Sequence, residues 1–110
     1  MSEPACSQRV LADFQEDLDF QFFKILAEPA RLELMQVLLE RGEADIATIS
    51  EGMKQDRSVV SRHLKAMLEK GFLRCRKEGR QCFYALDGSA IVKRLERILE
   101  TIKQAMKTCC

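Results

Sequence analysis

The sequence predicts a mainly α-helical domain with a single β-hairpin, and three observations carry this prediction. Apolar residues recur at helical spacing through most of the chain. Strand-like alternation appears only in residues 72–86, around a Glu-Gly pair that suits a tight turn. The chain has 110 residues, with no internal repeat and no linker. Residues 1–110 are therefore expected to form one domain around one core.

The first half of the chain predicts three helices. The first spans about residues 8–27, and the second begins at Pro29, which suits a first helical turn, and stops at Gly42. A short third helix lies between Asp45, a suitable cap, and Gly52. The first helix carries an apolar stripe made of Leu11, Phe14, Leu18, Phe22 and Ile25.

The next segment predicts a fourth helix. Asp56 can cap "RSVVSRHLKAMLEK", and Gly71 ends it. Its apolar stripe consists of Val60, Leu64, Met67 and Leu68. A short helix, a brief connection and a second helix with small polar residues at its start form a helix-turn-helix.

The hairpin follows directly and would serve as a basic wing beside this motif. Its strands are expected in "FLRCRK" and "RQCFYAL". A turn centred on Glu78–Gly79 would place Cys75 directly opposite Cys82, although moving the loop by one residue would break that pairing. A last helix is expected over about residues 89–107, and Cys109 continues its apolar stripe of Ile91, Leu95, Ile98, Ile102 and Met106.

Charge is unevenly distributed, although the formal net charge is only +1. Residues 1–53 hold four Lys/Arg against 11 Asp/Glu, whereas residues 54–80 hold nine against three. A basic block on the helix-turn-helix and hairpin suggests a cationic face for a polyanion. A solvated surface without a nucleic-acid partner is the alternative.

Three stretches, in order, resemble the ArsR/SmtB family of winged-helix transcriptional repressors. "LAEPARLELM" is similar to the family's ALADPTRLRIL segment, and "SVVSRHL" is similar to its S-x-V-S-x-H-L recognition helix. A basic, Gly-centred hairpin ending in an aromatic residue follows at the right distance. The resemblance covers nearly the whole chain and implies a winged helix-turn-helix that pairs through its terminal helices, binds DNA and is no enzyme.

The predicted DNA-binding residues fall into two groups. The exposed first turns of the fourth helix would enter the major groove and reach bases, while cations beyond them would neutralise phosphates. The base-reading candidates are Gln55, Arg57, Ser58, Val59, Ser61 and Arg62, and the phosphate candidates are Lys65, Arg76, Lys77 and Arg80. The resemblance gives His63, the single histidine, a DNA-backbone or helix-packing role.

The terminal helices predict a homodimer. Their apolar stripes offer more surface than so small a core can cover, and uncovered stripes usually mark a partner. A two-fold dimer places its recognition helices about 34 Å apart, one turn of DNA, and so predicts an imperfect palindrome as the operator.

The resemblance also implies that an inducer releases the DNA, yet the usual inducer sites are missing. The third helix reads "EADIATI" where the arsenic and cadmium branch resembles ELCVCEL, so Asp45 and Ala47 stand at the cysteine positions. The last helix has no histidine and only two carboxylates, Glu96 and Glu100, for a zinc or nickel site. Gln36 stands where persulfide-sensing relatives carry a cysteine.

The cysteines remain as candidate inducer ligands. Thiolates without histidine suit soft species such as trivalent arsenic or antimony, methylarsenite, mercury or copper(I). We expect Cys109 and Cys110 to chelate the inducer, because a fraying helix end lets adjacent side chains converge. Some arsenic-responsive members resemble this chain in having vicinal cysteines near the end of the last helix. A third thiolate would come from Cys82 or, less readily, from Cys75 or Cys6.

Alternatives stay open at this point. Cys75 and Cys82 could be small buried side chains of the hairpin, and the signal could be a disulfide or persulfide instead of a bound ligand. A helical interaction protein without DNA is a further possibility, whereas one isolated histidine argues against a thiol enzyme. No permanently bound cofactor is expected. The chain lacks both a signal pattern and a membrane-length apolar run, which favours a cytoplasmic protein with reduced thiols and no membrane partner.

Overall fold

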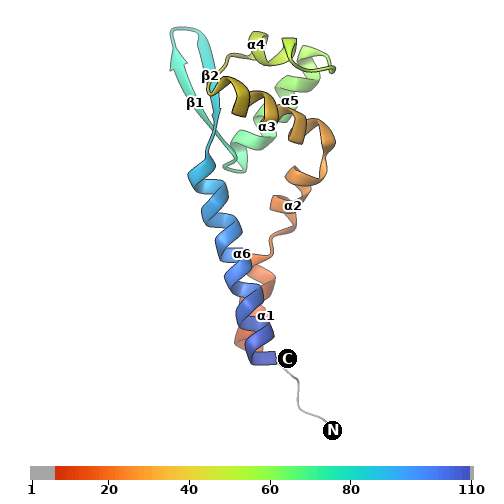
Figure 1. The fold of residues 1–110 in the computed structure, drawn as a ribbon, viewed down its shortest axis with the longest axis vertical. Helices are drawn as coiled ribbons and strands as arrows, with labels where there is room; N and C mark the ends of the chain where they lie inside the picture. The colour runs from red at the N-terminus through yellow and green to blue at the C-terminus, as the bar shows by residue number, and fades with distance from the viewer. Residues whose placement is uncertain (1–6, 110) are drawn as a thin grey trace.

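The computed structural model describes residues 7–109, leaving residues 1–6 and 110 outside. The molecule measures 62 × 23 × 21 Å, and a helical body with a hairpin stands on an arm of two helices (Figure 1). The elements in order are α1 (Gln8–Asp17), α2 (Phe20–Ala27), α3 (Pro29–Arg41), α4 (Ile46–Glu51), α5 (Arg57–Glu69), β1 (Leu73–Glu78), β2 (Gln81–Leu86) and α6 (Gly88–Cys109). This confirms a mainly helical fold with one antiparallel hairpin.

The single helix expected over residues 8–27 is wrong, because the chain breaks at Leu18 and Asp19. The backbone N–H of Leu18 closes α1 on the carbonyl of Phe14 at 3.0 Å. The Asp19 carboxylate then caps α2 by accepting from the N–H of Gln21 at 2.8 Å. The break sends the two halves of the apolar stripe to different places: α2 enters the body while α1 lies along α6 (Figure 1).

The core lies in the body, between α2, α3, α4, α5 and the start of β1. Its seven largest fully buried side chains are Leu34, Leu38, Ile49, Val60, Leu64, Met67 and Phe72. Phe22 of α2 stacks on Phe72 with ring centroids 5.0 Å apart, which ties α2 to the entrance of the hairpin. The expected boundaries of α3 are confirmed, since it begins at Pro29 and ends at Gly42, whose φ is +80°.

The centre of the hairpin turn lies one residue later in the chain than expected, which changes the register of the two strands. Gly79 has a φ of +64° and occupies the first of two loop positions, where a tight turn of this hand takes glycine. Cys75 therefore lies opposite Tyr84, and Cys82 lies opposite Lys77. The expected direct pairing of Cys75 with Cys82 is wrong, and the two are diagonal neighbours on one face.

The arm consists of α1 packed on α6, which begins one residue earlier and ends two residues later than expected. Asp17 joins the two helices, accepting from Arg97 Nε at 3.0 Å and from the Thr101 hydroxyl. No residue of α1 and only Ile98 of α6 is buried. The apolar side chains left exposed on the arm are Leu11, Phe14, Val92, Leu95, Leu99, Ile102 and Met106.

Candidate nucleic-acid interface and cysteine sites

The α4–turn–α5 unit presents one face of α5 to solvent. Val60, Leu64 and Met67 recur at helical spacing and are buried, so the opposite face is exposed. The exposed face carries five of the predicted DNA-binding residues: Arg57, Ser58, Ser61, Arg62 and Lys65. Asp56 occupies the cap position in an extended conformation, but its side chain makes no cap hydrogen bond, contrary to the expectation.

Two of the predicted base-reading residues are less accessible than the others. Gln55 and Val59 are both half-buried. The Oε1 atom of Gln55 is buried and has no hydrogen-bond partner within the described residues. Both are therefore less available to a base than the five exposed residues of α5.

His63 connects α5 to α3. Its Nδ1 accepts a hydrogen bond from Arg31 Nε at 3.2 Å, and Arg31 Nη1 also donates to the carbonyl of Lys24 at 3.2 Å. Burial and the positive charge of Arg31 lower the pKa of His63 below its usual value. The contact fits the helix-packing role. Arg31 was absent from the sequence prediction, because no local pattern links residues 32 positions apart.

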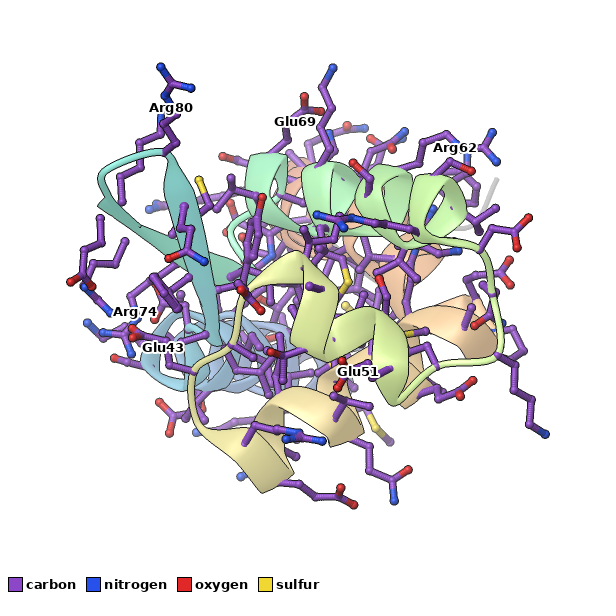
Figure 2. All side chains as sticks on the ribbon, turned by 90° about the horizontal axis from the view of Figure 1, so that it is seen from above. Glu43, Glu51, Arg62, Glu69, Arg74 and Arg80 are labelled. Carbon is purple, nitrogen blue, oxygen red and sulfur yellow. The ribbon has the colours of Figure 1, made fainter. Side chains whose placement is uncertain are left out.

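The hairpin adds positive charge on the side of the molecule where α5 exposes its polar face. Lys77 and Arg80 are exposed near the tip. Figure 2 shows Arg80 at the hairpin tip and Arg62 on α5 along the same edge of the molecule, with Glu69 between them. Cations of the hairpin and of the recognition helix can thus approach one polyanion together.

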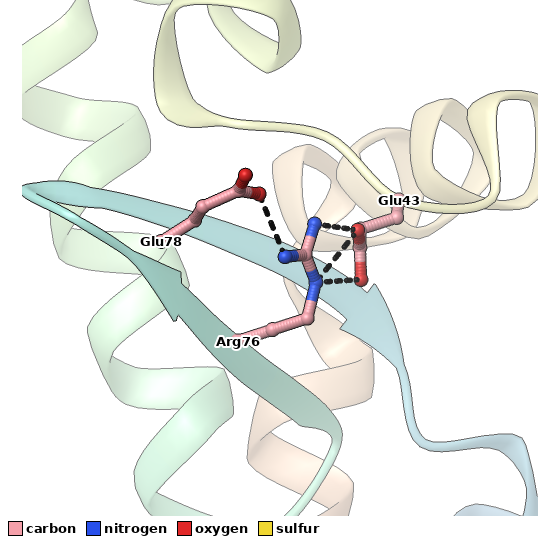
Figure 3. Close-up of polar contacts among 3 residues, drawn as sticks. All are labelled: Glu43, Arg76 and Glu78. Carbon is pink, nitrogen blue, oxygen red and sulfur yellow. Dashed lines mark hydrogen bonds and ion pairs between the residues drawn. The ribbon is translucent and has the colours of Figure 1, made fainter.

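Arg76 is differently placed from the other phosphate candidates. Its guanidinium donates to both carboxylate oxygens of Glu43, with Nη2–Oε1 at 2.7 Å, and its Nη1 donates to Glu78 Oε2 at 2.8 Å (Figure 3). These pairs raise the pKa of Arg76, while the hydrogen bond from Arg76 lowers the pKa of Glu43. A phosphate would have to compete with two carboxylates for this cation. The neighbouring Arg74, which the sequence prediction omitted, is exposed on the same strand face.

The structure separates the cysteines into two regions. Cys75 and Cys82 are half-buried free thiols of the hairpin. Cys109 ends α6 and is disulfide-bonded. The 22 residues of α6 span about 33 Å, so Cys82 and Cys109 of one chain lie far apart. Cys6 and Cys110 lie outside the described residues, and within residues 7–109 no three His, Cys, Asp or Glu side chains cluster as a metal site would require.

A helix-turn-helix with an exposed polar face, flanked on the same side by a basic hairpin, defines a winged-helix DNA-binding protein. The family described as "Bacterial regulatory protein, arsR family" matches residues 28–74, the region from α3 to the start of β1. Within residues 7–109 no helix is long and apolar enough to cross a membrane.

Relatives extend the match beyond this region. The arsenical resistance operon repressor of Escherichia coli K12 is 38% identical over 63% of this chain, a match that spans 59% of that repressor. A probable mercury resistance operon repressor of Streptomyces lividans is 34% identical over 86% of this chain and 76% of its own length. The crystal structure of a possible transcriptional regulator for arsenical resistance superposes with a TM-score of 0.58, at 30% identity, over 74% of this chain and 79% of the other.

The chain belongs to the ArsR family of bacterial regulatory proteins. It is a transcriptional repressor of the ArsR/SmtB type and not an enzyme.

Proposed function

We propose that this repressor acts as a homodimer, binds an imperfect palindrome through α5 and the hairpin, and releases it when a trivalent arsenic or antimony species binds its cysteine thiolates. The observation that carries the DNA-binding part of the proposal is the position of Arg62 and Arg80 along the same edge of the molecule (Figure 2). It allows one duplex to meet the helix in a groove and the hairpin at the backbone.

The dimer part of the proposal is supported by the exposed apolar surface of the arm. Seven large apolar side chains of α1 and α6 are exposed there, and within residues 7–109 no further layer of protein covers the arm (Figure 1). A second copy placed on this surface would cover the stripe and set the spacing between two α5 helices. The operator is then expected to have two half-sites about one helical turn apart.

The inducer part of the proposal is supported by ligand chemistry. Relatives are named for resistance to arsenicals and to mercury, which both prefer thiolates. The chain offers five cysteines and a single histidine, and that histidine is occupied by Arg31. Cys109 is half-buried in the last turn of α6, at the end of the arm that would form the dimer, and Cys110 follows it in the sequence.

Release requires that the inducer bind the DNA-incompetent conformation more tightly than the DNA-bound one. A coupling free energy of about 1–3 kcal/mol is typical of such regulation. The coupling is reciprocal, so operator DNA should weaken inducer binding by the same factor.

Oxidation is the second candidate signal, and one observation favours it. Cys109 is disulfide-bonded in the structure, and a reversible disulfide at the end of the arm is one form that an oxidation signal would take. The thiolate proposal accordingly concerns the reduced protein, and the two signals are separable by experiment.

A fluorescence-anisotropy titration of operator DNA with reduced protein tests the DNA-binding part and the inducer part of the proposal. We expect salt-dependent binding to a palindromic fragment and release by arsenite, antimonite or methylarsenite. If the protein binds the DNA and none of the three metalloids releases it, the inducer part of the proposal is wrong and the DNA-binding part is kept. Release by peroxide, with no response to the three metalloids, would favour the oxidation signal.

A further inference from the structure

Cys75 and Cys82 bring two thiols together on one face of the hairpin. The register places Cys75 opposite Tyr84 and Cys82 opposite Lys77, so the two cysteines are diagonal neighbours across the strands. A hydrogen bond between their side chains holds the pKa of Cys75 above its usual value. Both thiols are free.

This pair lies where the hairpin passes from core to solvent. Leu73, on the same face, is buried in the core, while Lys77 on that face is exposed. The cysteines between them are half-buried, so a small solute can reach the sulfurs without unfolding of the domain. β1 also contacts α5, so the strand that carries Cys75 adjoins the recognition helix.

Tyr84 completes the surroundings. It lies opposite Cys75, on the hairpin face that carries both cysteines. Burial and the two neighbouring thiols raise its pKa. Its backbone also pairs with Ala44 in both directions, at 2.8 and 3.0 Å, which fixes the hairpin to the segment between α3 and α4.

We propose that Cys75 and Cys82 form an inducer site in the hairpin, a dithiol that binds a trivalent arsenic species carrying two exchangeable hydroxyl groups. This inference rests on the proposed function and names a site for it. Two As–O bonds break and two As–S bonds form, and each thiol proton leaves with a hydroxyl as water. The oxidation state of arsenic does not change, so no oxidant or reductant is consumed.

The placement of the pair suits a ligand that two thiolates can share. Cys75 and Cys82 are diagonal neighbours on one face of the hairpin. Trivalent arsenic is thiophilic and can bond to both sulfurs of such a pair. Within residues 7–109 no cluster of three carboxylate, imidazole or thiol groups surrounds the pair, so hard divalent ions lack ligands here.

The position of the pair gives arsenic a route to the DNA. The cysteines lie between the core residue Leu73 and the loop that carries Arg80. Replacing a hydrogen bond between the strands by two As–S bonds changes the local spacing and twist of the hairpin. Arg80 then moves relative to Arg62, and the two no longer fit one duplex equally well.

The composition supplies a direct readout, because Tyr84 is the single tyrosine and the chain has no tryptophan. Tyrosine emission therefore reports on this site and not on the end of the arm. The protein to titrate is the full chain with Cys6, Cys109 and Cys110 changed to Ser, which keeps the hairpin intact. We expect methylarsenite and arsenite each to change Tyr84 emission and to saturate at one arsenic per chain.

Two matched variants test the assignment. Cys82→Ser and, separately, Cys75→Ser in the same background should abolish the saturable change in emission. Intact-protein mass spectrometry should show one adduct in the parent and none in either variant. Circular dichroism verifies that each variant is folded, and Cys82→Ala replaces Cys82→Ser if the latter unfolds.

The outcomes distinguish this site from the proposed function. Unchanged emission and no adduct in the parent would overturn the hairpin site. Release of operator DNA from the wild-type protein by arsenicals would then place the signal at the other cysteines and preserve the proposed function. If methylarsenite binds and arsenite does not, the site is supported and its specificity is restricted to monomethyl arsenicals.

Discussion

Arg76 of β1 and Glu43, which follows α3, form a two-pronged ion pair, with Nη2–Oε1 at 2.7 Å and Nε–Oε2 at 3.3 Å. The pair joins the outer face of the hairpin to the end of α3 (Figure 3). Glu78 holds the remaining side of the same guanidinium at 2.8 Å. A cation expected to neutralise a phosphate is thus neutralised within the protein, which makes the ion pair a competitor of DNA.

Glu43→Gln should increase DNA affinity if Arg76 reaches a phosphate when it is released. One additional phosphate contact steepens the slope of log K against log salt by about 0.9. Binding measured at four salt concentrations gives this slope. Glu40→Gln is the matched control, since it removes an exposed carboxylate of α3 that makes no ion pair within residues 7–109. Equal slopes for the two variants would exclude Arg76 as a phosphate contact.

The contrast between α3 and the first predicted helix shows where sequence patterns suffice. Pro29 and Gly42 limit α3 through their own backbone preferences, so its ends could be predicted from single residues. The break at Leu18 and Asp19 falls within an apolar stripe that is continuous in the sequence. It depends on Asp19 capping α2 and bonding to Arg94, 75 residues away. Pattern alone cannot show that contact.

The candidate site divides in the same way. The exposed residues of α5 follow from the spacing of Val60, Leu64 and Met67, so that face was predictable. The occupied state of Arg76 and the contact between Arg31 and His63 depend on tertiary packing. The hairpin register depended on a single loop position, and a one-residue error there changed the relation between two cysteines from opposite to diagonal.

Arg62 and Lys65 should have different effects on DNA recognition. Both are exposed on α5, but Arg62 lies nearer its N-terminus, the part that enters a groove. Arg62→Gln should cost about 1–3 kcal/mol and relax the preference at one base position of each half-site. Lys65→Gln should weaken all sequences alike and reduce the salt slope by about one. Competition between operators with single-base changes measures both effects, and uniform weakening by Arg62→Gln would assign Arg62 to a phosphate.

Asp19→Ala should destabilise the protein by about 1 kcal/mol, the usual value for removing an N-cap carboxylate. Asp19 caps α2 through Gln21 and accepts from Arg94 Nη2 at 3.0 Å, so it also connects α2 to α6. Asp19→Asn keeps a capping oxygen and should lose less. Urea unfolding measures both variants. If Asp19→Asn loses as much stability as Asp19→Ala, the effect is due to the ion pair with Arg94 and not to the cap.

The low pKa of His63 makes the protein less stable in mild acid. The folded state binds fewer protons than the unfolded chain between the lowered pKa and about 6.5. Stability is thus complete above about pH 6.5 and decreases as the pH falls toward the lowered pKa. Burial is the main cause, Arg31 and Arg62 add to it, and Glu28 opposes it.

Urea unfolding at pH 7.5 and 5.5 tests this dependence, and we expect a smaller free energy of unfolding at the lower pH. His63→Gln should remove most of the difference, since glutamine does not titrate. The carboxylates of Glu43 and Asp45 have lowered pKa values, so they titrate below this window. A difference that persists unchanged in His63→Gln would assign it to another group.

Leu99→Glu should convert the proposed dimer to monomers. Leu99 lies on α6 of the arm and is 52% exposed in one chain, so a carboxylate there is tolerated in the monomer. In a dimer formed through the arm, the same charge would be buried without a partner, at a cost of several kcal/mol. Sedimentation velocity should show the monomer mass, and operator affinity should fall because two linked half-site contacts become one. Leu39→Glu introduces the same charge on α3, at a side chain 72% exposed, and should remain dimeric. If Leu99→Glu sediments as a dimer while Leu39→Glu dissociates, the interface lies on α3 and not on the arm.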